Sequence, residues 1–313
     1  MRCKDLYEGP LAAEKLLDTL EHRRLSRTSV VWSDDSCKRA AQVYGEMTDK
    51  AYEFEETVFE ISPKVELCVL SRSDWMKIPF CRPQPYGDPI CPEGRIFVGN
   101  EAPTSWKDYT ISVVKNASPV VKNKLLALSE AQPGSDVKVA VESLFSLEFF
   151  AGTLAHEIAH IFQAGALMIP HNIDFDGIEK RGDANRLDFF WIGEFVCQYA
   201  QFAFLKSYDA RLCDKWLKFY QIWYDSAKDL VDYKKMSEWG SKYPEIRMRN
   251  LMNNILWYQS KAMVMASELY AIHGISFLKS AKRTLGISHN WVLANLTSEV
   301  ENFDKLLDEW DTR

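Results

Sequence analysis

Two histidines stand four residues apart, with a glutamate directly after the first, in residues 153–162 (TLAHEIAHIF). On an α-helix this spacing puts the imidazoles of His156 and His160 on one face, about 40° apart around the axis, so both can reach one metal ion. Glu157 lies about 100° further round and flanks that ion without binding it. The pattern predicts a zinc-binding helix, and the alternative is two histidines satisfied within a helical core.

A third ligand is expected downstream, because catalytic zinc usually takes three protein ligands and keeps a fourth position for water. Glu194 is preferred, since a helical pattern from about residue 186 to 206 can present it beside the histidines. Asp183 and Asp188 compete with it, because both lie closer to His160 in the sequence. Gln198 follows Glu194 by one helical turn, and its amide oxygen is expected to accept the N–H of a zinc-bound histidine.

The residues around the histidines fit a helix that buries its other side in the core. The apolar residues on that side are Leu147, Phe150, Ala151, Leu154, Ile158, Ile161 and Phe162. Gly152 shares the histidine face, and its lack of a side chain is expected to leave room for a substrate or a metal-bound water. Gly165 offers a stop to the helix.

With HExxH on one helix and a glutamate on a later one, the chain resembles the gluzincins, the thermolysin-like and aminopeptidase-N-like zinc peptidases. Residues 191–195 (WIGEF) look like the Trp-x-x-Glu segment of the aminopeptidase-N group. Residues 194–198 (EFVCQ) look like the Glu-x-x-x-Asp segment of thermolysin-like enzymes, with Gln198 where those enzymes carry an aspartate. The likeness covers about residues 153–200, and the 33 residues between His160 and Glu194 exceed the spacing in aminopeptidase N.

The resemblance implies an α+β fold, predominantly α, with a zincin-like two-lobed catalytic domain. Residues 1–166 would form an N-terminal lobe with a small β-sheet and the HExxH helix, and residues 167–313 a helical C-terminal lobe with the third ligand. In this family an edge strand beside the cleft holds the peptide by β-strand addition, and Val98–Glu101 is a candidate for that edge. A donor to the reacting oxyanion is also expected, with candidates Tyr243, Tyr258, Tyr270, His273 and, in the loop, His171.

The expected function is a zinc-dependent peptidase that acts on a peptide or protein substrate. Glu157 would take a proton from the zinc-bound water and deliver it to the leaving amine. A zinc hydrolase of a non-peptide amide would use the same three ligands. A non-catalytic interaction protein with the zincin fold and a structural zinc is a further alternative, which Glu157 argues against because a structural site needs no base.

The composition is ordinary for a soluble globular protein, with 26% charged and 47% hydrophobic residues in 313. A net charge of −6 and a pI near 5.6 argue against nucleic-acid or anionic-membrane partners, which favour basic surfaces. The first residues lack the apolar region of a secretory signal, and no run reaches the length of a membrane span. A cytoplasmic protein is therefore expected, with export by a route without a recognisable signal as the alternative; the oligomeric state is not predicted.

Seven scattered cysteines without a CxxC pair favour reduced thiols, although Cys81 and Cys91 could bridge a loop in an exported protein. Helical patterns are expected over about residues 10–25, 35–58, 210–232, 246–272, 276–285 and 289–310. Strands are expected at residues 65–70, 95–99 and 109–114, with a Pro- and Gly-rich loop over 79–94. The aromatic stripe Trp216, Phe219, Tyr220 and Trp223 is expected to be core.

Overall fold

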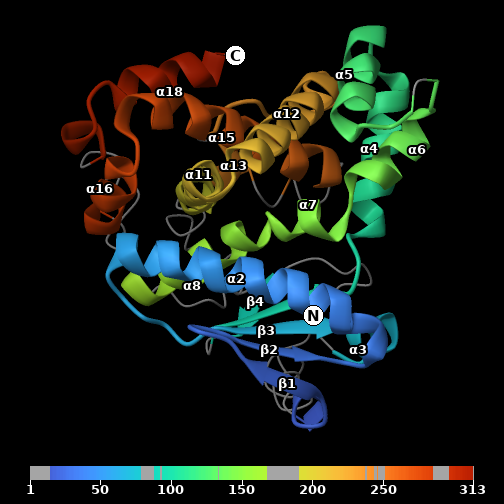
Figure 1. Cartoon of the computed structure of the whole chain (residues 1–313). Coiled ribbons are helices and arrows are strands. Elements are labelled where there is room, and N and C mark those ends of the chain that lie inside the picture. Colours follow the sequence, from blue (N-terminus) through green and yellow to red (C-terminus); the bar gives the residue numbers. More distant parts are fainter. Residues whose placement is uncertain are drawn as a thin grey trace.

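Figure 1 shows the computed structural model of the chain, which describes residues 15–78, 88–91, 94–132, 134–167, 190–236, 238–242, 245, 251–284 and 296–312. Its described part is mostly helical, with one small mixed sheet. The expected α+β class with a predominance of helix is therefore confirmed.

The sheet has five strands in the order β1-β2-β3-β5-β4. These strands are β1 (Glu21–Arg24), β2 (Ser29–Trp32), β3 (Glu66–Leu70), β4 (Asp88–Cys91) and β5 (Arg95–Gly99). The three inner strands β2, β3 and β5 are parallel, while β1 and β4 run antiparallel at the two edges. The charged and exposed β1 suits an edge, and the apolar runs of β3 and β5 suit central strands covered on both faces.

Alternate residues of the inner strands face two different layers, as the two-residue period of a strand requires. Leu67, Val69 and Ile96 belong to the main core beneath α2 (Lys38–Phe59). Cys68 and Phe97 point to the other side, into a smaller cluster with Leu17 and Trp75, the latter from α3 (Arg72–Trp75). The main core extends from Val30 to Trp310 and so includes residues from both expected lobes.

Helices α2, α7 (Leu147–Ala151) and α8 (Leu154–Leu167) lie over the sheet, as Figure 1 shows. Helix α2 packs along α8 and α7, with Tyr44 edge-on to Phe150 and Tyr52 edge-on to Phe162. The helix is interrupted at Gly152, between α7 and α8. There the N–H of His156 donates to the carbonyl of Thr153 instead of that of Gly152. Helix α8 continues past the expected stop at Gly165 and ends at Leu167.

The remaining helices form the layer farther from the sheet in Figure 1. They are α4 (Thr104–Asn116), α5 (Pro119–Ser129), α6 (Val137–Leu144), α11 (Phe190–Tyr208), α12 (Ala210–Ala227), α13 (Glu238–Ser241), α15 (Leu251–His273), α16 (Ser276–Thr284) and α18 (Phe303–Thr312). Helix α11 packs against α8 on one side and against α12 and α15 on others. It thereby joins the histidine-bearing helix to the C-terminal helices.

Three local expectations were wrong. Residues 21–24 form β1 instead of ending a helix, because β2 offers them an antiparallel partner, with Glu21 opposite Trp32. Residues 109–114 lie within α4, where the buried Thr110, Val113 and Val114 are three and four apart, as a helical face requires. The expected loop over residues 79–94 contains β4.

The helix over residues 38–59 and the strands at 66–70 and 95–99 are confirmed. After residue 210, helix is confirmed over 210–227, 251–272, 276–284 and 303–310, whereas residues 228–232 and 300–302, expected within helices, form mostly turns and bends between them. Val98–Glu101 is not the outer edge, because β5 lies between β3 and β4 in the sheet. The division into lobes at residue 166 stays a prediction.

Candidate metal centre

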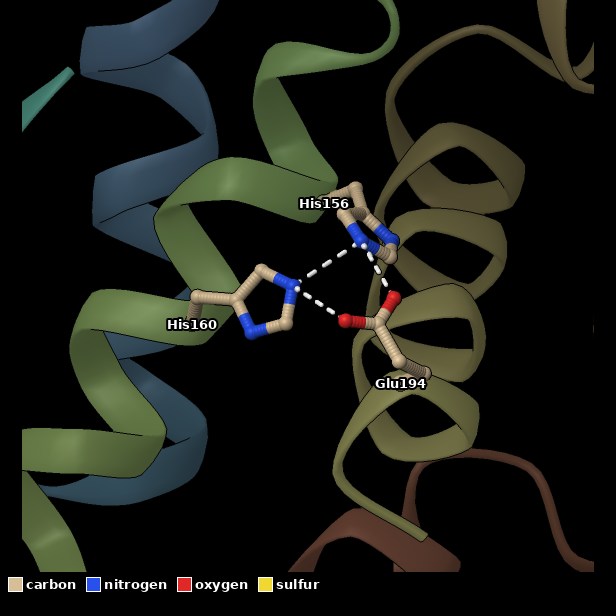
Figure 2. Close-up of side chains that lie close together, drawn as sticks. All are labelled: His156, His160 and Glu194. Atoms are coloured by element: carbon tan, nitrogen blue, oxygen red, sulfur yellow. Dashed lines mark hydrogen bonds and ion pairs between the residues drawn. The ribbon is translucent and has the colours of Figure 1, made fainter. Parts of the chain in front are cut away.

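His156, His160 and Glu194 converge on one point between α8 and α11, as Figure 2 shows. The Nε2 atoms of the two histidines lie 3.0 Å apart. One carboxylate oxygen of Glu194 lies 3.3 Å from His156 Nε2, and the other lies 3.4 Å from His160 Nε2. The helical spacing read from the sequence thus brings both imidazoles to one face, and the downstream glutamate meets them.

This donor set fits a small divalent cation. Tetrahedral zinc, with bonds of about 2.0–2.1 Å, holds its ligand atoms about 3.3 Å apart. The two histidine nitrogens are 3.0 Å apart, and each lies 3.3–3.4 Å from a different oxygen of the Glu194 carboxylate. Two imidazole nitrogens 3.0 Å apart cannot both direct a proton into the gap between them, whereas a cation attracts both lone pairs and the carboxylate. The side chains are only 5%, 23% and 15% exposed for His156, His160 and Glu194, so little water competes for these donors.

Burial raises the pKa of the Glu194 carboxyl, but its neighbours reverse this effect. The charge of His160 and hydrogen bonding by His156 act against burial, as does a hydrogen bond from the side chain of Gln259 on α15. The resulting pKa lies below its ordinary value of 4.5. Glu194 is therefore held as the carboxylate that a metal ligand must be.

Glu157 stands in the first turn of α8 and is not part of the converging group. Its carboxylate still acts on the same surroundings as Glu194. Burial raises the pKa of the Cys197 thiol, and Glu194 and Glu157 are among the carboxylates that raise it further. Glu157 is thus within electrostatic reach of Cys197, one of the residues that also respond to Glu194, and its role stays a prediction.

The hydrogen bond expected between Gln198 and a histidine is not formed. Gln198 Oε1 is buried without a hydrogen-bond partner, and so is His156 Nδ1. The Gln198 side chain instead lies against the hydroxyl of Tyr220 on α12. Burial raises the pKa of that hydroxyl, the bond to Gln198 lowers it, and the carboxylates of Glu157 and Glu194 raise it again.

The expected oxyanion donors do not gather at the ligands in the described part of the chain. The Tyr258 hydroxyl donates to the carbonyl of Lys235 at 3.0 Å, and His273 Nε2 lies 3.2 Å from the carbonyl of Glu301. Tyr270 packs its ring against Tyr199 and Phe202. His171 and Tyr243 lie outside the described residues, as do the competing ligands Asp183 and Asp188.

Gly152 makes room for a tryptophan rather than for a substrate. A Cβ atom there would come within 2.3 Å of Nε1 of Trp216, from α12. The same Nε1 donates to the carbonyl of Phe149 at 3.0 Å, and the indole stacks on the Phe149 ring. The expectation of an open space at Gly152 was therefore wrong, because α12 fills it.

Two residues near the ligands escaped the sequence pattern. Tyr220 belongs to the aromatic stripe, whose members are all buried as expected, yet the carboxylates of Glu157 and Glu194 both raise the pKa of its hydroxyl. Gln259 reaches Glu194 from α15, 65 residues along the chain, and no local spacing signals such a contact. The four cysteines whose side chains the structure describes, Cys37, Cys68, Cys197 and Cys213, are buried, while the side chains of Cys81 and Cys91 lie outside the described residues.

The chain matches no protein-family model, no curated protein and no solved structure in the comparisons made with each. The site is therefore interpreted from its own geometry. Within the described part of the chain, every helix is too short or too polar to cross a membrane.

Proposed function

We propose that this chain is a zinc-dependent peptidase, with His156, His160 and Glu194 as the metal ligands and Glu157 as the general base. The observation that carries the proposal is the meeting of two imidazole nitrogens and a carboxylate at separations of 3.0–3.4 Å. A zinc ion, when bound, supplies a water whose pKa is lowered towards about 7 and polarises a carbonyl group. The resemblance to gluzincins supports the reaction class and a two-lobed zincin-like arrangement.

Glu157 supports a catalytic site over a structural one. A structural zinc site is normally closed by four protein ligands, whereas the group found in the described residues has three. From the first turn of the same helix as the two histidines, the Glu157 carboxylate would accept a proton at one oxygen and later donate it to the leaving amine nitrogen. A purely structural site has no use for this residue.

The sheet favours a peptide over a smaller amide as the substrate. Strand β4 is the last strand of the described sheet, antiparallel to β5, and it packs against α8. The unpaired backbone groups of an edge strand can hydrogen-bond an extended peptide. A peptide added there would lie next to the helix that carries His156 and His160.

Metal analysis of the purified protein tests the ligands. We expect about one zinc per chain, lost in His156→Ala, His160→Ala and Glu194→Ala, because catalytic zinc depends on its three protein ligands. His22→Ala is the matched control, since His22 is exposed on β1, away from the site. Full zinc content in all three ligand variants would contradict the proposal.

Glu157→Gln tests the base. The amide keeps the shape of the side chain but cannot take the proton, so we expect wild-type zinc content and a loss of peptide hydrolysis of about 10²- to 10⁴-fold. Turnover of a peptide library, measured beside a set of non-peptide amides, provides the readout. Unchanged turnover in this variant would show that another group transfers the proton. If the wild type cleaves only the non-peptide amides, its substrate is such an amide and not a peptide.

A further inference from the structure

Two buried glutamines connect α8 and α11 on either side of the metal ligands. Gln163 Nε2, on α8, donates to the carbonyl of Gly193 on α11 at 3.0 Å. Gln201 Nε2, on α11, donates to the carbonyl of Gly152, just before α8, at 2.9 Å. Gln163 is 6% exposed and Gln201 is fully buried.

The order of these contacts along the chain shows that the two helices run antiparallel. The late residue of α8, Gln163, meets the start of α11, whereas the residue before α8, Gly152, meets a later turn of α11. Both histidines lie between Gly152 and Gln163, and Glu194 lies between Gly193 and Gln201. The two hydrogen bonds thus bracket the whole ligand group.

The Gly152 carbonyl, to which Gln201 donates, is freed by the break between α7 and α8. The N–H of His156, which would bond to Gly152 in a continuous helix, bonds to Thr153 instead. Gln201 satisfies the freed carbonyl one turn before the first metal ligand. Gln163, at the other end, holds the residue directly before Glu194.

We propose that Gln163 and Gln201 are positioning residues that fix the axial register of α8 against α11 and so hold the three ligand atoms together before the metal binds. This inference rests on the proposed metal site. Apolar contacts between the helices are not directional, and a shift by one residue moves a helix by about 1.5 Å along its axis. A metal site tolerates only about 0.5 Å, so directional bonds at both ends are needed to set the geometry.

Chelator competition and thermal unfolding with and without zinc test the inference. Gln163→Met and Gln201→Met keep the side-chain volume and remove the donor, so we expect each to weaken zinc binding by about tenfold or more, as supporting hydrogen bonds of metal sites typically do. The rise in unfolding temperature on adding zinc should shrink in parallel, because it follows the affinity. Gln198→Met is the matched control: Gln198 is as buried, lies on α11, and its side chain lies against Tyr220 of α12.

The outcomes distinguish a role in positioning the metal ligands from a role in stability alone. If the two variants unfold at lower temperature without zinc but bind it as tightly as the wild type, the glutamines are structural only and the inference is wrong. An equal loss of zinc affinity in Gln198→Met would also contradict the inference, because the effect would then follow from losing any buried amide and not from losing a hydrogen bond between α8 and α11. Gln163→Asn, which keeps the amide but shortens its reach, gives the same test if the methionine variant does not fold.

The wild-type arm separates this inference from the proposed function. A wild type that binds no zinc would remove the metal site and the positioning role together. A wild type that binds zinc but cleaves no peptide would contradict only the proposed peptidase activity. The zinc affinities of the glutamine variants would still test whether Gln163 and Gln201 fix the register of the two helices.

Discussion

Glu194 depends on a neighbour that lies far from it in the sequence. Its side chain faces both histidines, and hydrogen bonding by the Gln259 side chain on α15 is among the causes that lower the pKa of its carboxyl. The residues around Gln259 are held in place: Tyr258 donates to Lys235, and Lys261 donates to the carbonyl of Lys234 at 2.7 Å. Gln259 therefore stands on a fixed stretch of helix, from which we expect its amide to orient the carboxylate.

Gln259→Met is expected to weaken zinc binding by about 10- to 100-fold, because it removes a bond that orients a ligand. Competition with a chromophoric chelator measures this affinity. Gln221→Met, at an exposed position of α12, is the control for the same chemical change. An affinity equal to that of the wild type would show that the two histidines suffice to orient Glu194.

The sequence could predict the ligands but not their supports. His156 and His160 share one helix, so the helical period alone fixes their relation. Glu194 could be inferred from the chemistry of a third ligand. Gln259 and Tyr220 approach from α15 and α12, and their places depend on how helices far apart in the chain pack, which no local pattern contains. Gln198 failed as an expected support because Tyr220, on another helix, engages its side chain.

At the scale of elements, local patterns identified the long helices α2, α8, α11, α12 and α15 and the strands β3 and β5, and failed where tertiary contacts decide. Residues 109–114 alternate like a strand, yet they follow Pro103 into α4, where Thr110, Val113 and Val114 meet the core. Residues 21–24 became a strand only because β2 pairs with them. In both cases the structure of the segment depends on a packing partner elsewhere in the chain, which the local sequence does not reveal.

The break between α7 and α8 depends on close contact with α12. In Gly152→Ala the new methyl group would meet Nε1 of Trp216 at 2.3 Å, and that indole is fixed by its bond to Phe149 and by stacking. We expect a loss of about 1–3 kcal/mol or more in the free energy of unfolding, as for other overpacked cores. Denaturant unfolding of the metal-free protein measures it.

Gly193→Ala is the matched control for that substitution. Its methyl group would lie 3.6 Å from Gln163 Oε1, an ordinary contact, within α11. Alanine is favoured over glycine in a helix by up to about 1 kcal/mol, so we expect unchanged or slightly higher stability. Equal destabilisation in both variants would show that the contact with Trp216 is not what requires Gly152.

At the scale of the whole molecule, α2 covers the main core and carries a buried acid into it. Glu55 is fully buried, and neither of its carboxyl oxygens has a hydrogen-bond partner. Glu55 lies near Cys197 of α11. Burial raises the pKa of the Cys197 thiol, and the negative charges of Glu194, Glu55 and Glu157, when ionised, raise it further. Burial raises the pKa of Glu55 itself well above its ordinary value of 4.5, so the folded protein holds this group as the neutral acid.

This acid makes the stability of the fold depend on pH in a defined direction. Between pH 4.5 and the raised pKa, the folded state keeps a proton that the unfolded state has lost. Stability contributed by Glu55 is therefore complete below about pH 4.5 and falls as the pH rises, by up to about 1.4 kcal/mol for each pH unit. Above the raised pKa the loss is constant.

Glu55→Gln removes this dependence, because the amide stays neutral in both states. We expect the variant to match the wild type near pH 4.5 and to exceed it in the free energy of unfolding at pH 7.5, since the wild type alone loses stability between these values. Denaturant unfolding at both pH values measures the difference, with chelator present so that protons and metal do not compete at the ligands. Glu46→Gln, at an exposed position of α2, is the control and should leave the pH dependence unchanged. If the gain of Glu55→Gln is the same at both pH values, Glu55 does not hold its proton in the folded protein, and its carboxylate must be stabilised by a group not yet recognised.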